Sequence, residues 1–172
     1  MLIDLQLDSE MEPTVALLYA TVTDTYKRLE LLVKDVELEE LLYKGPNGDV
    51  NSIGQILRHL AVVDLHWAYR FKQQSIPQTI KDNYGPLINS CGQLPSVVNT
   101  TVTDLINRYE IVQKMIQLEC RKLSRDDLNK VVSYENGKNA TIRWGIWHIA
   151  DHSRYHQAHI NMLRKHYKQQ KA

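Results

Sequence analysis

Apolar residues recur every three or four positions along most of the chain, which is the spacing of one face of an α-helix. The first such stripe predicts a helix over residues 10–35, and it consists of Val15, Leu18, Val22, Tyr26, Leu29 and Val33. A second stripe begins after Ser52 and Gln55, a pair with the spacing of a capping box. It predicts a second helix from residue 52 to about residue 75.

Residues 76–95 hold three prolines and two glycines and are predicted to be a linker. A connection of about twenty residues is longer than two antiparallel neighbouring helices need. The linker is therefore interpreted as a crossover along the bundle, so that the second and third helices run parallel. A further apolar stripe predicts the third helix over residues 98–123.

The dipeptide Asn136-Gly137 is typical of a two-residue hairpin turn, because both positions favour positive φ. It predicts two short strands, followed by a last helix from about Thr141 to Lys168. The expected fold class is all-α. We predict a single domain, residues 1–172, that forms an up-down-down-up four-helix bundle with a long crossover between helices 2 and 3 and a small β-hairpin before helix 4.

The composition excludes several classes of function. The 172 residues carry 21 basic and 20 acidic side chains, a formal net charge of +1, which gives no basic surface for nucleic acid. No apolar run approaches the roughly 18 residues of a membrane span, and the N-terminus lacks the order of a signal peptide. The two cysteines form neither a CxxC pair nor a disulfide framework. We expect a cytoplasmic protein that binds neither nucleic acid nor membranes.

Four of the seven histidines fall within twelve residues of the predicted last helix. His152 and His156 are four positions apart, so they lie on one helix face and can grip a single transition-metal ion. His59 is the best candidate for a third ligand. It lies on the apolar stripe of the second helix, at about the height of the pair if the two helices are antiparallel. His66, on the same face, is the alternative.

The other polar residues near this pair are given weaker interpretations. His148 lies about 12 Å along the helix axis from His156, too far to share one ion, and is interpreted as a supporting, pocket-wall or core histidine. His159 and His166 are interpreted as structural or exposed. Asp151 either orients a ligand on a neighbouring turn or is a surface carboxylate. No catalytic side chain is assigned.

Two stretches carry a resemblance to a known family: Ser52-x6-His59, and His148-Ile-Ala-Asp151-His152-Ser-Arg-Tyr155-His156-Gln157-Ala158-His159. They resemble the DinB-like (YfiT-like) family of metal-dependent enzymes, whose last helix typically reads His-x2-Asn/Asp-His-x2-His-His-Arg-Gly-Gln. The resemblance covers the whole chain and implies that His59, His152 and His156 are the metal ligands. Tyr155 replaces the first histidine of the family's pair, and Gln157-Ala158-His159 replaces Arg-Gly-Gln.

The resemblance implies an enzyme, because the family includes transferases and isomerases that use bacillithiol or mycothiol. Three neutral histidines also leave a coordination position open, as catalytic sites do. The expected cofactor is a divalent transition metal, zinc or nickel first and iron or manganese second. The expected partners are a small-molecule substrate, such as a low-molecular-weight thiol, and a second copy of the chain in a homodimer. The reaction would be thiol S-transfer or hydrolysis. The alternative is a non-catalytic metal-binding or stress-related bundle.

Overall fold

The computed structural model describes residues 2–171 and contains four long helices, two short helices and one hairpin in that range. In chain order the helices and strands are α1 (Pro13–Val33), α2 (Leu38–Leu42), α3 (Ile53–Phe71), α4 (Gln78–Tyr84), α5 (Val102–Cys120), β1 (Val131–Ser133), β2 (Asn139–Thr141) and α6 (Ile142–Lys171). Single 3₁₀ turns lie at Asp127–Asn129 and Glu135–Gly137. The predicted all-α fold with its small hairpin is confirmed.

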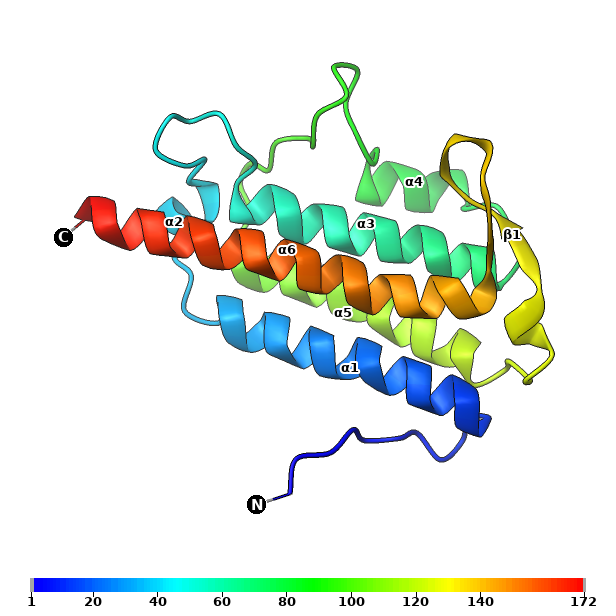
Figure 1. Ribbon diagram of the computed structural model, residues 1–172. Coiled ribbons are helices and arrows are strands. Elements are labelled where there is room, and N and C mark those ends of the chain that lie inside the picture. The colour runs from blue at the N-terminus through cyan, green and yellow to red at the C-terminus, as the bar shows by residue number, and fades with distance from the viewer. Residues whose placement is uncertain (1, 172) are drawn as a thin grey trace.

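The long helices follow the predicted up-down-down-up order. Figure 1 shows α3 and α5 running in one direction and α1 and α6 in the other. Side-chain contacts agree with this picture: Tyr109 of α5 contacts Asp64 of α3, and further along both helices Glu119 lies 3.9 Å from Lys72. Two parallel neighbours require a long connection, which is the predicted crossover.

The crossover differs from the predicted linker in two ways. It contains the short helix α4, whose Tyr84 is buried and donates a hydrogen bond to the carbonyl of Arg108 on α5. It also extends to Thr101, because α5 begins at residue 102 rather than 98. Thr101 and Asp104 form a complete capping box that fixes this start, and Val98, which precedes it, is 75% exposed.

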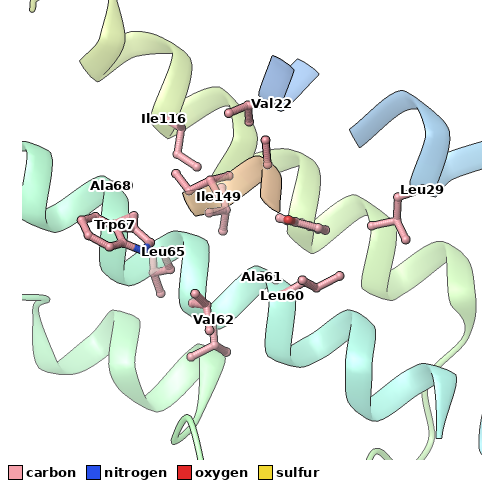
Figure 2. Packing of buried hydrophobic residues seen from close by; sticks show 14 of the residues in the cluster. Val22, Leu29, Leu60, Ala61, Val62, Leu65, Trp67, Ala68, Ile116 and Ile149 are labelled. Carbon is pink, nitrogen blue, oxygen red and sulfur yellow. The ribbon is translucent and has the colours of Figure 1, made fainter. Parts of the chain in front are cut away.

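The core forms where the apolar stripes of the four long helices meet (Figure 2). Trp67 of α3 is fully buried in this core, to which Val22, Leu29, Ile116 and Ile149 of the other three helices also belong. Gly145 of α6 faces the Trp67 ring so closely that an added Cβ would overlap it. The missing side chain therefore lets α6 approach α3 closely at this point.

The hairpin turns at the predicted position, but its connection is one residue longer than predicted. Val132 pairs with Ala140 in the antiparallel ladder, and both Asn136 and Gly137 have positive φ, 56° and 73°. The amide of Tyr134 donates to the carbonyl of Lys138 at 2.7 Å, so three residues, 135–137, connect the paired positions instead of two. The hairpin brings Tyr134 against Trp67 in the core, with ring centroids 5.4 Å apart.

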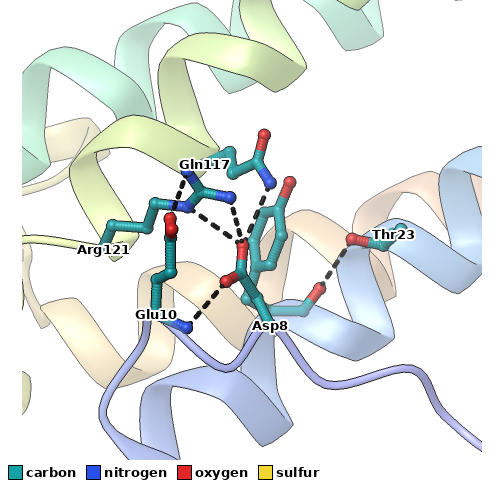
Figure 3. Close-up of polar contacts among 6 residues, drawn as sticks. Asp8, Glu10, Thr23, Gln117 and Arg121 are labelled. Atoms are coloured by element: carbon teal, nitrogen blue, oxygen red, sulfur yellow. Dashed lines mark hydrogen bonds and ion pairs between the residues drawn. The ribbon is translucent and has the colours of Figure 1, made fainter.

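The segment that precedes α1 is held by polar contacts to α5 (Figure 3). The Asp8 carboxylate accepts hydrogen bonds from Gln117 at 3.1 Å and from Arg121 at 3.0 Å, and Arg121 also pairs with Glu10 at 2.6 Å. These contacts lie on the side of the bundle away from the α3–α6 pair. Within residues 2–171, no helix combines the length and apolarity needed to cross a membrane.

Candidate metal centre

Two antiparallel helices, α3 and α6, carry the three histidines of interest. The start of α3 is fixed by the predicted capping box: the Ser52 hydroxyl accepts from the Gln55 amide, and the Gln55 side chain accepts from the Ser52 amide. His59 lies almost two turns further on, facing α6. His152 and His156 lie on consecutive turns of α6, so both rings face α3.

The structure brings the three predicted residues together. Nε2 of His152 lies 3.3 Å from Nε2 of His59 and 3.1 Å from Nε2 of His156. One nitrogen from each ring lies within 4.8 Å of the other two, and no other group of three potential ligands within residues 2–171 meets this criterion. The predicted alternative, His66, does not belong to this cluster.

The donor set fits a metal ion. An ion bound tetrahedrally at about 2.0–2.1 Å from each imidazole separates the nitrogens by about 3.3 Å, and the two short contacts are 3.1 and 3.3 Å. The Nδ1 atoms of all three rings are buried and have no hydrogen-bond partner in the described part of the chain. The lone pairs that converge are those of Nε2, and a bound cation would satisfy them. The Nδ1 atoms lie on the other side of each ring and would carry the ring protons.

Burial keeps the three rings neutral. Desolvation, reinforced by the charge of Arg58, lowers the pKa of His59 from 6.5 to about 4. Desolvation and then the other imidazoles lower the pKa of His152 to about 3. Desolvation and His59 lower the pKa of His156 to about 4. At pH 7 all three rings are uncharged, which is the form that binds metals.

The remaining candidates surround the cluster without joining it. His148 packs between Trp144 and His152, in agreement with its interpretation as a supporting residue. His159 is half-buried and touches the edge of the His156 ring, with centroids 5.6 Å apart. Asp151 is exposed, as expected of a surface carboxylate.

Sequence reasoning missed Tyr134. Its hydroxyl lies 3.4 Å from Nε2 of His148, and its ring packs on both Trp67 and Trp144. No sequence spacing links a hairpin residue to a helix residue fourteen positions later, because the contact depends on how the hairpin folds back. The only local signal is an aromatic residue directly before the Glu135-Asn136-Gly137 turn.

A cavity of about 840 Å³ adjoins the cluster at His156. Its walls come from the later turns of α6, the start of α3, and two loops, residues 44–51 and 92–94. The short helix α2 supports the first loop, since Arg164 of α6 pairs with its buried Glu40 at 2.8 Å. This volume falls in the range of small-molecule sites.

Fold and cluster together define a helical bundle with a three-histidine centre that can hold a metal ion. Comparison with known proteins gives the family. The model of the DinB superfamily matches residues 21–160. The chain is also 44% identical over 167 residues to the uncharacterized protein YkkA of Bacillus subtilis (strain 168), in an alignment that covers 96% of this chain and 95% of that protein. The chain belongs to the DinB superfamily, which confirms the resemblance found in its sequence.

Proposed function

We propose that the protein is a metal-dependent enzyme of the thiol S-transferase or hydrolase type that acts on a small molecule. One observation carries this proposal: three converging histidine nitrogens lie beside a cavity large enough for a small organic ligand. Three protein ligands leave a coordination position open, which is typical of catalytic rather than structural sites.

His59, His152 and His156 are the proposed ligands, and their neutral imidazoles suit zinc or nickel, with iron and manganese as the alternatives. When bound, such an ion supplies a Lewis acid that lowers the pKa of a thiol or of water toward neutrality. The chain supplies the orientation of the ligands and a partly enclosed space next to them.

The cavity is the proposed substrate site. Met162 and Leu163 give it apolar surface, Lys44 and Asp49 place one charge of each sign at its rim, and Tyr155 adds a hydroxyl. Such a lining suits a small molecule with polar substituents. Among these we favour a low-molecular-weight thiol, because thiol-dependent transferases occur in the resembling family and thiolates are good ligands of zinc.

The second candidate function is a metal-binding bundle without turnover. It is favoured by the surroundings of the three rings, whose aromatic neighbours are other imidazoles and Tyr155. Within residues 2–171, no carboxylate or hydroxyl is hydrogen-bonded to the three histidines. General acid–base catalysis would need such a group within reach of the substrate.

The test starts from protein purified without a histidine tag, with bound metal measured by mass spectrometry. The metal-loaded protein is then assayed with a panel of thiols and chlorodinitrobenzene, and separately for hydrolysis of p-nitrophenyl acetate. The variants His59→Ala and His156→Ala remove proposed ligands, and His166→Ala is the matched control on α6. We expect about one ion per chain and turnover in the wild type and in the control, and neither in the ligand variants.

The outcomes separate the two functions. Equal metal content in all four proteins would refute the ligand assignment. One ion per chain without turnover under any thiol, and without hydrolysis, would favour the non-catalytic bundle.

We further propose that the protein is a cytoplasmic homodimer. Each of two helices exposes a pair of leucine or isoleucine residues on one face, namely Leu17 and Leu31 on α1 and Ile111 and Leu118 on α5, and such apolar surface is common at protein interfaces. Both cysteines are free, as in a reducing compartment. A mass of one chain in light scattering would refute the proposed dimer.

A further inference from the structure

The central histidine of the cluster has no hydrogen-bond anchor. Metal-binding histidines usually donate their second ring nitrogen to a carboxylate or a carbonyl, and this bond fixes the ring orientation. In His152 the second nitrogen, Nδ1, is buried and has no partner among the described residues. Yet its Nε2 takes part in both short contacts of the cluster. Another interaction must therefore set the orientation of this ring.

Stacked rings on α6 provide that interaction. Trp144, His148 and His152 are spaced by four residues, so their side chains lie above one another on one helix face. The His148 ring lies nearly parallel to Trp144, at 10° and 4.5 Å between centroids, and it stacks on His152 at 26° and 5.4 Å. One face of the His152 ring is thus covered by His148, while His59 and His156 meet this ring edge-on.

The hairpin holds the stacked rings of Trp144, His148 and His152 in place. Tyr134 meets the His148 ring edge-on, with ring centroids 5.8 Å apart, and its hydroxyl lies 3.4 Å from Nε2 of His148. Tyr134 is itself stacked on Trp67, at 23° and 5.4 Å. Arg70 of α3 donates to the carbonyl of Ser133 at 3.0 Å and lies over the Tyr134 ring. The hairpin, which carries none of the proposed ligands, thereby holds the His148 ring that stacks on the ligand His152.

We propose that His148, held between Trp144 and Tyr134, is a positioning residue that orients the His152 ring for metal binding by stacking against it. The inference rests on the proposed function, since it concerns the same metal site. It adds that the aromatic surface of His148, and not its nitrogen atoms, is what the site requires. His148 lies outside the group of potential ligands, in agreement with this role.

The test compares two substitutions of one residue. His148→Phe keeps a flat ring but no nitrogen, and His148→Ala removes the ring. Both are titrated with Co²⁺, whose visible absorption reports the geometry of its ligands, and His166→Ala is the matched control. We expect His148→Ala to weaken Co²⁺ binding by about tenfold and to alter the spectrum. His148→Phe and the control should bind within about twofold of the wild type, with its spectrum.

Each other outcome overturns the proposal in a distinguishable way. Weakened binding in both His148 variants would mean that its nitrogen is needed, and wild-type binding in His148→Ala would mean that the ring has no role. If circular dichroism shows that His148→Ala does not fold, Trp144→Leu is tested in its place. We expect this variant to bind Co²⁺ about threefold more weakly, because a weak aromatic pair contributes about that much. Unchanged affinity in Trp144→Leu would then overturn the proposal. A wild-type protein that binds no Co²⁺ would overturn the metal site itself and His148's role with it.

Discussion

Helix α3 carries a buried carboxylate, Asp64, and a half-buried imidazole, His59, and their surroundings differ. At Asp64, the Tyr109 hydroxyl at 2.5 Å and the Gln113 amide at 2.9 Å both donate to one carboxylate oxygen. At His59, the polar contact is Nε2 of His152, and Nδ1 has no partner within residues 2–171. The first side chain is held by donors of the protein, whereas the second faces nitrogens like its own.

The difference separates a structural cluster from a functional one. A buried polar group costs free energy unless it is paired. Tyr109 and Gln113 both donate to Oδ2 of Asp64, while Oδ1 has no partner within residues 2–171. The two donors connect α3 to α5. The histidines leave their lone pairs facing one another, and an ion would complete them. We therefore expect the histidine cluster to bind metal at some cost to the stability of the metal-free protein. The Asp64 cluster should do the reverse, stabilising the fold without affecting metal binding.

The largest expected effect is the loss of metal-linked stability in His152→Ala. Zinc at one thousand times its dissociation constant should stabilise the wild type by about 4.1 kcal/mol, because it binds only the folded state. The variant should gain none of this. Without metal it should unfold within about 1 kcal/mol of the wild type, since the substitution also removes an unpaired buried imidazole. Urea unfolding with zinc and with EDTA measures both quantities. Equal zinc stabilisation in the two proteins would contradict the comparison.

Next in size is the loss of stability in Asp64→Ala. Without the carboxylate, the Tyr109 hydroxyl and the Gln113 amide lose their acceptor in the core, which should lower the free energy of unfolding by about 2 to 4 kcal/mol. Bound zinc should stay at the wild-type level. Asp64→Asn is the matched control, because its amide oxygen can still accept. Loss of zinc from the folded Asp64→Ala protein would show that the two clusters are coupled.

The pH dependence of stability tests the Asp64 cluster more finely. Burial raises the pKa of Asp64 from 3.8 to about 7, although its two donors act in the opposite direction. Between these values the folded state holds a proton that the unfolded state releases. The contribution of Asp64 is thus complete below pH 4 and is lost as the pH rises toward 7. Compared with Asp64→Asn, the wild type should lose at most about 1.4 kcal/mol for each pH unit. Parallel pH profiles of the two proteins would refute this pKa shift.

The sequence predicted the parts of this molecule that depend on local spacing. The apolar stripes and the Ser52 capping box located the long helices, and the interval of four placed His152 beside His156 on one face. The prediction of His59 as a ligand required a further assumption, that its helix is the antiparallel neighbour of the last helix. The structure confirms that arrangement of helices, and the grouping of the three rings follows from it.

Other features depend on contacts between distant segments, which local spacing does not encode. The pairing of Tyr134 with His148 arises only when the hairpin folds onto α6, and the cavity forms from two loops without regular patterns. Asp64 did leave a signal, since it is an acidic residue within the apolar run from Leu60 to Leu65. Its donors on α5 could not be named without the register of two helices joined by the long crossover.

The smallest expected effect concerns Asp151, the carboxylate next to His152 in sequence. Successive helix residues point about 100° apart, and Asp151 is exposed, so it should not support the ring. Asp151→Asn should bind zinc within about twofold of the wild type, whereas losing a ligand's hydrogen-bond partner typically costs about 10- to 100-fold. Competition with a chromophoric chelator measures this affinity. A tenfold loss would mean that the histidine cluster, like that of Asp64, depends on a carboxylate partner, and the contrast between the two clusters would disappear.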